Sequence, residues 1–235
     1  MALHYSRATS LVRNLCRLLG GWQVVGRENF PKTGGAILAP NHVSFMDPPV
    51  AGSACPRQPW FMAKSELFRP PVFGTLIRWC RAFPVKRGTA DRAALRRAEE
   101  LLERGEVVLV FAQGGRFFGP GLGEPEMGLG MLALRAKVPI VPMAVLGTEQ
   151  TLPRHAKFLH RGKTVVYIGE PLAFPELYEK PKPTKEDREF VAHEVMRALG
   201  ELLERACRER GLRHPQQGAT QGTTEEQPAG PAGGG

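Results

Sequence analysis

A histidine and an aspartate stand five positions apart in the segment "NHVSFMD" (residues 41–47), and prolines bound this segment on both sides. If the segment were one helix, His42 and Asp47 would point about 140° apart, since each residue turns about 100°. Pro40 and Pro48 instead favour a strand that ends near His42 and a helix that opens at Asp47. Such a fold-back would let Asp47 accept the Nδ1 proton of His42, which leaves Nε2 as a general base.

The same segment also admits a purely structural interpretation. Asp47 followed by Pro48 is a good helix N-cap and first-turn pair. Ser44 lies in the segment, but no Gly-x-Ser-x-Gly elbow surrounds it, so we expect a turn or capping role rather than a nucleophile. No further histidine or carboxylate lies nearby to complete a metal site, so no metal is expected. Spacing alone therefore leaves catalysis and helix capping open.

Two cationic segments follow apolar runs further along the chain. Gly114 and Gly115 let backbone N–H groups approach an anion, and Arg116 can bind phosphate oxygens with two donors. Lys86 and Arg87 form the other segment. Taken alone, the glycines can form an ordinary turn and the cation pair a solvated surface. Their order after the histidine segment favours an anion-binding site.

Segments typical of strands and helices alternate along the chain, and several of the strands are apolar throughout. The main strands are expected within residues 34–40, 58–67, 106–117, 138–147 and 163–172, and the main helices within residues 48–56, 70–83, 90–105, 128–137 and 185–210. This pattern predicts a single α/β domain with a central, mostly parallel sheet flanked by helices. Functional residues of such folds gather past the carboxyl ends of the strands, where the segments above and Lys64 are expected.

Composition sets the domain limits and the kind of partner. The chain has 235 residues, 42% of them hydrophobic, which fits one domain with a full core over residues 22–214. Residues 215–235 contain no large apolar side chain, so a disordered tail is expected.

That tail holds Glu225 and Glu226 and no Lys or Arg, so the rest of the chain carries a net charge of +11. This excess favours an anionic membrane surface or a phosphorylated ligand; no nucleic-acid recognition motif is found.

Residues 1–21 are expected to form an N-terminal basic amphipathic helix. Two sets of residues interleave there, the apolar Leu11, Leu15 and Leu18 and the basic Arg7, Arg13 and Arg17. Such a helix can lie flat on an anionic bilayer, or it can pack on the domain with its arginines in water. No segment approaches the roughly 18 apolar residues of a membrane-spanning helix, and the four cysteines form no disulfide or zinc pattern.

Four segments, taken in order, resemble the sequence blocks of the glycerolipid acyltransferases, and most closely those of the lysophosphatidic acid acyltransferases. The first block, Asn-His-x-x-x-x-Asp, is matched by Asn41, His42 and Asp47. The others are matched by "FPVKRG" (residues 83–88), "FAQGGR" (residues 111–116) and "VPIVP" (residues 138–142). The resemblance covers about residues 24–172.

This resemblance implies an enzyme of phospholipid biosynthesis in which His42 is the general base and Asp47 orients it. The activated hydroxyl of a lysophospholipid, first of all lysophosphatidic acid, would attack the thioester of acyl-CoA or an acyl carrier protein. No acyl-enzyme and no further cofactor are implied. The implied phosphate or headgroup site consists of Lys86, Arg87, Gly114, Gly115 and Arg116, supported by Asn41, Lys64 and Gln113. A lipid acceptor also implies a peripheral position on the cytoplasmic face of the membrane, with the N-terminal helix docked on it.

The third block departs from the usual Phe-Pro-Glu-Gly-Thr-Arg at three positions. Ala112 replaces the proline, Gln113 the glutamate and Gly115 the threonine. Gln113 keeps the capacity for hydrogen bonds but lacks the charge that would position a cation or a hydroxyl. The departures leave two alternatives: an acyltransferase for a different lysolipid acceptor, or a lipid-binding relative with weakened catalysis. A third alternative is a thioesterase, which would use the same base to release the acyl group to water.

Overall fold

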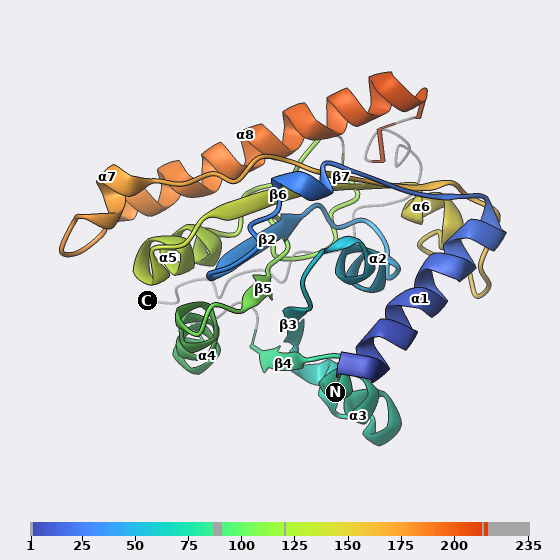
Figure 1. Ribbon diagram of the computed structural model, residues 1–235, viewed down its shortest axis with the longest axis horizontal. Coiled ribbons are helices and arrows are strands. Elements are labelled where there is room, and N and C mark those ends of the chain that lie inside the picture. Colours follow the sequence, from blue (N-terminus) through green and yellow to red (C-terminus); the bar gives the residue numbers. More distant parts are fainter. Residues whose placement is uncertain (1, 87–90, 120, 213, 216–235) are drawn as a thin grey trace, which may run out of the picture.

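The computed structural model describes residues 2–86, 91–119, 121–212 and 214–215, with side chains from Tyr5 onward (Figure 1). Arg87 and the predicted tail after residue 215 lie outside the described residues. Within the described residues, the strands of one seven-stranded sheet are β1 (Trp22–Val25), β2 (Ala36–Pro40), β3 (Pro59–Lys64), β4 (Ala82–Val85), β5 (Val107–Leu109), β6 (Ile140–Leu146) and β7 (Thr164–Ile168).

The strand order is β1-β7-β6-β2-β5-β3-β4. The strands from β6 to β4 are all parallel, whereas β7 pairs with β6 in the antiparallel sense and with β1 in parallel. The predicted α/β domain with a mostly parallel sheet is therefore confirmed. Because β2, β5 and β6 are neighbours and parallel, the loops that follow them emerge at the same edge of the sheet.

The helices that the structure describes cover both faces of this sheet. They are α1 (Ala2–Leu19), α2 (Asp47–Ala54), α3 (Pro71–Trp79), α4 (Arg92–Glu103), α5 (Met127–Ala136), α6 (Thr148–Thr151), α7 (Pro175–Tyr178) and α8 (Lys185–Arg210), with the 3₁₀ turns η1 (Arg27–Asn29) and η2 (Ser65–Phe68). Figure 1 shows α8 and α5 on one side of the sheet and α1 and α2 on the other.

Local sequence signals explain where the longer helices begin and end. Asp91 caps α4, because its side chain accepts hydrogen bonds from the backbone N–H groups of Ala93 and Ala94. Thr184 caps α8 in a reciprocal capping box with Asp187, and Gly211 ends that helix with φ 60°. These caps satisfy backbone groups that have no partner within the helix.

Alternate residues of the strands fill two separate cores, as the two-residue period of a strand requires. Ile37 of β2 packs towards α4, α5 and α8, in a core that includes Leu101, Leu132 and Leu199. Leu38, the next residue, packs towards α1 and α2, together with Val50. Each buried aliphatic side chain contributes about 1.5–3 kcal/mol of transfer free energy, so both helix layers hold the sheet in place.

The N-terminal helix α1 packs on the domain along one side, and its contact with a bilayer stays a prediction. One side packs on the domain, since the Tyr5 hydroxyl donates to the Gly52 carbonyl oxygen at 2.7 Å and Cys16 is fully buried. The other side carries Leu11 and Leu18, which are 70% and 79% exposed. The boundary predicted at residue 21 stays a prediction. No helix in the described part of the chain is long and apolar enough to cross a membrane.

Candidate active site

His42 and Asp47 are in direct contact. β2 ends at Pro40 and α2 begins at Asp47, and the turn between them folds back. His42 Nδ1 lies 2.8 Å from Asp47 Oδ2. Because a carboxylate only accepts hydrogen bonds, Nδ1 carries the proton and Nε2 keeps its free lone pair. The predicted fold-back is thus present, and its geometry suits a general base.

Asp47 is fully buried, and its two oxygens accept several hydrogen bonds. In addition to His42, the backbone N–H groups of Val43 and Ser44 donate to Oδ2 at 2.6 and 2.7 Å. The Thr148 hydroxyl donates to Oδ1 at 2.5 Å. These donors and the first turn of α2 compensate for the buried charge. Asp47 therefore stabilises the turn as well as orienting His42.

The imidazole of His42 is held from two further directions. Its ring stacks on that of Phe111 with 3.8 Å between centroids and an interplanar angle of 13°. Its backbone N–H donates to Gln113 Oε1 at 3.0 Å, and its carbonyl oxygen accepts from the Phe117 N–H at 3.0 Å. The loop after β5 thus fixes the histidine on the side away from Asp47.

Asn41 and Ser44 have structural contacts. Asn41 is fully buried, and its side-chain amide exchanges two hydrogen bonds with the backbone of Val145, at 2.7 and 2.9 Å. It therefore joins the turn between β2 and α2 to β6. Ser44 Oγ accepts from the Met46 N–H at 3.2 Å and donates to the Leu152 carbonyl oxygen at 3.0 Å. Both contacts are those of a turn-stabilising residue.

Strand order decides which of the expected residues come together. The ends of β6, β2 and β5 are adjacent, and they bring Thr148, His42 and Gln113 side by side. Lys64 ends β3, where it is about half exposed and pairs with Glu66 at 3.5 Å. Lys86 follows β4, which is three strands from β2, or roughly 14 Å at the usual strand spacing. Neither lysine is an immediate neighbour of His42.

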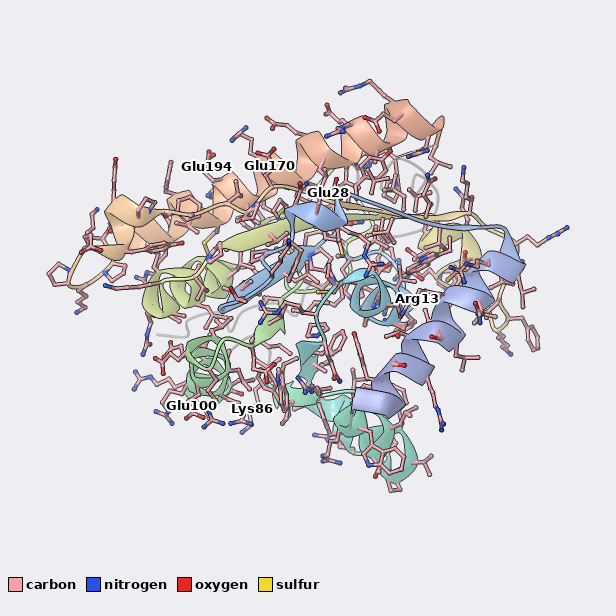
Figure 2. The ribbon with its side chains drawn as sticks, viewed as in Figure 1. Arg13, Glu28, Lys86, Glu100, Glu170 and Glu194 are labelled. Carbon is pink, nitrogen blue, oxygen red and sulfur yellow. The ribbon has the colours of Figure 1, made fainter. Side chains whose placement is uncertain are left out.

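A pocket of about 750 Å³ connects Lys86 with the glycine turn after β5. Its lining includes Lys86, Gln113, Gly114 and Gly115, and also Phe111, on whose ring His42 stacks. Figure 2 shows Lys86 next to α4. Arg116 lines a smaller hollow of about 240 Å³ with Gln113 and Gly115. The structure therefore brings Lys86, Gly114 and Gly115 to one pocket and Arg116 to a second hollow, and His42 lines neither of them. Arg87 lies outside the described residues.

Arg116 is held by aromatic side chains. Its guanidinium carbon lies 3.7 Å from the centre of the Phe45 ring and 5.5 Å from that of Phe118. Phe45 belongs to the turn between β2 and α2 and is 60% exposed. A cation over an aromatic face gains about 0.5–2 kcal/mol, so Arg116 ties the loop after β5 to this turn near the surface.

The pocket carries both signs of charge. Its ionisable lining comprises Lys86, Lys185 and Arg188 and the acidic Asp91, Glu126 and Glu189. Glu126 caps α5 by accepting from the Gly128 N–H at 3.2 Å, and its other oxygen lies where a side chain on Gly114 would stand. The Nε2 atom of Gln113 is buried and has no hydrogen-bond partner within the described residues. A bound headgroup would therefore meet donors and carboxylates together.

A second carboxyl group lies behind Asp47. Burial raises the pKa of Glu149 above its usual value, and the negative charge of Asp47 raises it further. A raised pKa favours the neutral form of this acid. Among the described residues, no group of three or more His, Cys, Asp or Glu side chains could hold a metal ion.

Comparison with known proteins shows the family of the chain. A family model described as "Acyltransferase" matches residues 21–146, more than half of the chain. The chain belongs to the acyltransferase family. The resemblance predicted from the four sequence blocks is thereby confirmed, and with it the prediction of an O-acyltransferase.

Three known proteins are similar to this acyltransferase. The 1-acyl-sn-glycerol-3-phosphate acyltransferase of Bacillus subtilis is 32% identical over 171 residues, which cover 72% of this chain and 82% of that protein. The lyso-ornithine lipid O-acyltransferase of Pseudomonas aeruginosa is 30% identical over 131 residues, covering 55% and 50%. The crystal structure of the 1-acyl-sn-glycerophosphate acyltransferase PlsC from Thermotoga maritima superposes with a TM-score of 0.65 and 26% identity, covering 83% of this chain and 79% of that one.

Thr148 is a positioning residue of this acyltransferase that the sequence did not single out. We expect Thr148→Val to lower kcat about tenfold, since a hydrogen bond to a charged group contributes about 1.5–3 kcal/mol and only part of it acts on the orientation of His42. Thr148→Ser keeps the hydroxyl and should keep the rate. Steady-state kinetics of both variants test this, because a purely structural role predicts reduced stability with an unchanged kcat.

Proposed function

We propose that this acyltransferase moves a fatty acyl group from acyl-CoA or an acyl carrier protein to the free hydroxyl of a lysophospholipid. Lysophosphatidic acid, which would become phosphatidic acid, is the first acceptor to test, because two of the similar proteins carry that substrate in their names. The observation that carries the proposal is the buried His42–Asp47 pair, with 2.8 Å between Nδ1 and Oδ2, which stacks on Phe111 of the 750 Å³ pocket.

The geometry supports a direct transfer. His42 Nε2 removes the proton of the acceptor hydroxyl as its oxygen attacks the thioester carbonyl carbon. Asp47 stabilises the imidazolium that forms, as the orienting residue does in serine-hydrolase triads. The C–S bond then breaks, and the imidazolium returns the proton to the leaving thiolate. No acyl-enzyme forms and no cofactor takes part besides the thioester co-substrate.

The pocket is the proposed site of the acceptor headgroup. Lys86 and Arg116 would hold its phosphate, with Arg87 as a further contributor. Gly114 and Gly115 would shape the turn that lines the pocket, because their N–H groups already donate to the carbonyl oxygens of Phe111 and Gln113 at 2.9 and 2.7 Å. Gln113 would support the site through the backbone of His42. Lys64, at 49% exposure and paired with Glu66, has the weakest case for a direct contact.

A different lysolipid acceptor is the second candidate function. It is favoured by the carboxylates of Asp91 and Glu126 in the pocket and by the neutral Gln113. These groups suit a headgroup with an ammonium group better than a phosphate alone, and one similar protein is named for a lyso-ornithine lipid. The His42–Asp47 contact favours an active acyltransferase, with either acceptor, over a lipid-binding relative without activity.

A panel of lysolipid acceptors with acyl-CoA, or with acyl carrier protein as donor, tests both candidates, with products identified by mass. We expect phosphatidic acid from lysophosphatidic acid at a higher rate than any product from zwitterionic or amino-lipid acceptors. The reverse order would support the second candidate. Free fatty acid formed without an acceptor would indicate a thioesterase, and no product with any acceptor would leave only lipid binding.

The proposed location is peripheral, on the cytoplasmic face of the membrane, where both thioester donors are made. The exposed side of α1, with Leu11 and Leu18 beside Arg7 and Arg17, is the proposed contact with an anionic bilayer. Residues 1–21 would then serve as a docking helix, and residues 22–214 as the acyltransferase domain.

A further inference from the structure

Helix α3 turns large apolar side chains outward. Val72 and Trp79 are 84% and 80% exposed, and Leu76 and Phe73 are 53% and 45% exposed. At about 100° per residue, Val72, Leu76 and Trp79 lie within roughly 60° of one another, and Phe73 borders them. A stripe of this width on a helix normally faces a protein core. On α3 it faces outward.

Packing of the opposite side fixes this orientation. Gly74 is the buried residue of α3. A side chain at that position would collide with the carbonyl oxygen of Phe68 in η2, so the helix lies directly on that turn. The guanidinium of Arg78 also lies 5.1 Å from the centre of the Phe68 ring. Because only a glycine fits at the contact, the apolar stripe cannot rotate inward.

Positive charge lies near the stripe. The segment from residue 64 to residue 81 contains Lys64, Arg69, Arg78 and Arg81 against the acidic Glu66, a net charge of +3. Arg69 is exposed just before the helix begins, whereas Arg78 is exposed on the side of Gly74, about 130° from the stripe. An exposed apolar surface with a basic border is complementary to an anionic lipid surface, and tryptophan is enriched at the level of lipid headgroups.

We infer that α3 is a membrane-docking element, which inserts Val72, Phe73, Leu76 and Trp79 among the lipids while Arg69 contacts anionic headgroups. We call these five residues the α3 surface. The inference deepens the proposed function, on which it rests for the lipid acceptor, because it adds a second contact to that of α1. α3 also begins at the carboxyl edge of the sheet, the edge that carries His42.

Other occupants of the α3 surface fit less well. Residues 216–235 contain no large apolar side chain and could not fill the stripe. A second copy of this chain in a two-fold arrangement would bring the same net charge of +3 against itself. Figure 1 shows α3 next to β4, at the border of the domain, so a broad surface can approach it.

Cosedimentation with lipid vesicles tests the inference without any need for turnover. The wild-type protein should bind vesicles of phosphatidylcholine and phosphatidylglycerol more strongly than vesicles of phosphatidylcholine alone. The combined variant Val72→Ser, Leu76→Ser and Trp79→Ser should lower the partition coefficient by at least about tenfold. Phe158→Ser, which removes an 80% exposed aromatic side chain elsewhere, should leave it unchanged. All four positions are exposed, so circular dichroism should show an unchanged fold.

Lipids with bromine on their acyl chains test the insertion itself. They should quench wild-type tryptophan fluorescence, and Trp79→Phe should remove most of that quenching. Equal vesicle binding by the triple variant and the wild type would overturn the inference. So would a concentration-dependent dimer, seen by analytical ultracentrifugation, that the triple variant abolishes while its vesicle binding persists.

The choice of acceptor separates this inference from the proposed function. The triple variant should acylate a short-chain lysolipid, dissolved as monomers, at the wild-type rate, and should lose most of its rate on an acceptor embedded in vesicles. Vesicle binding that depends on the α3 surface, in a protein without transfer activity, would refute the proposed function alone. Transfer activity with no effect of the α3 variants on binding would refute the docking inference alone.

Discussion

His42→Ala should lower kcat by about 10²–10⁴-fold, the usual contribution of a general base. The wild-type imidazole has its Nδ1 proton bonded to Asp47 at 2.8 Å and its ring stacked on Phe111, so Nε2 is held ready to accept a proton. Alanine removes that group and leaves the acceptor hydroxyl without a base. Initial rates with saturating acyl-CoA and acceptor measure the effect.

Ser44→Ala is the matched control for this prediction. Ser44 lies in the same turn and is 2% exposed, but its hydroxyl contacts only backbone atoms among the described residues. Its variant should keep kcat close to the wild-type value, because the proposed mechanism includes no acyl-enzyme. Added imidazole should restore part of the activity of His42→Ala. Near-normal turnover of His42→Ala, or a large loss in Ser44→Ala alone, would contradict the mechanism.

Acidic pH should lower the rate of the wild-type enzyme. His42 accepts a proton only while its imidazole is neutral, so the rate should fall on the acid side of the pH–rate profile. A profile with no fall on the acid side would contradict a histidine base.

Asp47→Asn is expected to have the second large effect, a fall in kcat of about 10²–10⁴-fold at nearly unchanged KM. The amide oxygen can replace Oδ2 and accept from the N–H groups of Val43 and Ser44, and its NH₂ group can donate to the Thr148 hydroxyl. The turn can therefore form. A neutral amide, however, stabilises the imidazolium of His42 much less than a carboxylate does.

Stability measurements separate orientation from folding at this position. Asp47→Asn should lower the free energy of unfolding by about 1–3 kcal/mol, and Asp47→Ala by more, because alanine leaves the buried donors without an acceptor. Urea denaturation followed by circular dichroism gives both values. A folded Asp47→Asn protein with kcat within about tenfold of the wild type would refute the orienting role.

The longest elements could be predicted because their signals are local. α8 spans Lys185–Arg210, the range that its sequence pattern indicated, since its capping threonine and terminal glycine are adjacent in sequence to the residues they cap. The apolar run of β2 and the prolines beside it likewise placed the strand end and the helix start around His42. Contact between His42 and Asp47 depends on these neighbouring residues alone, and it was predicted correctly.

The rest of the site depends on contacts between distant parts of the chain. Thr148 lies 101 residues from Asp47, and it reaches that carboxylate because β6 is the parallel neighbour of β2. Phe111 stacks on His42 for the corresponding reason, since β5 is the other neighbour. No local periodicity encodes which strands are adjacent, so the sequence did not predict these partners.

By itself, the sequence predicted the family, the α/β class, the contact between His42 and Asp47 and the glycine turn, because each depends on residue types at short spacing. Only the tertiary structure decided the antiparallel pairing of β7 with β6, the separation of Lys64 and Lys86 from His42, the mixed charge of the pocket and the exposed stripe of α3. These features follow from strand order and helix orientation, which minimise the free energy of the whole packed domain rather than that of any one segment.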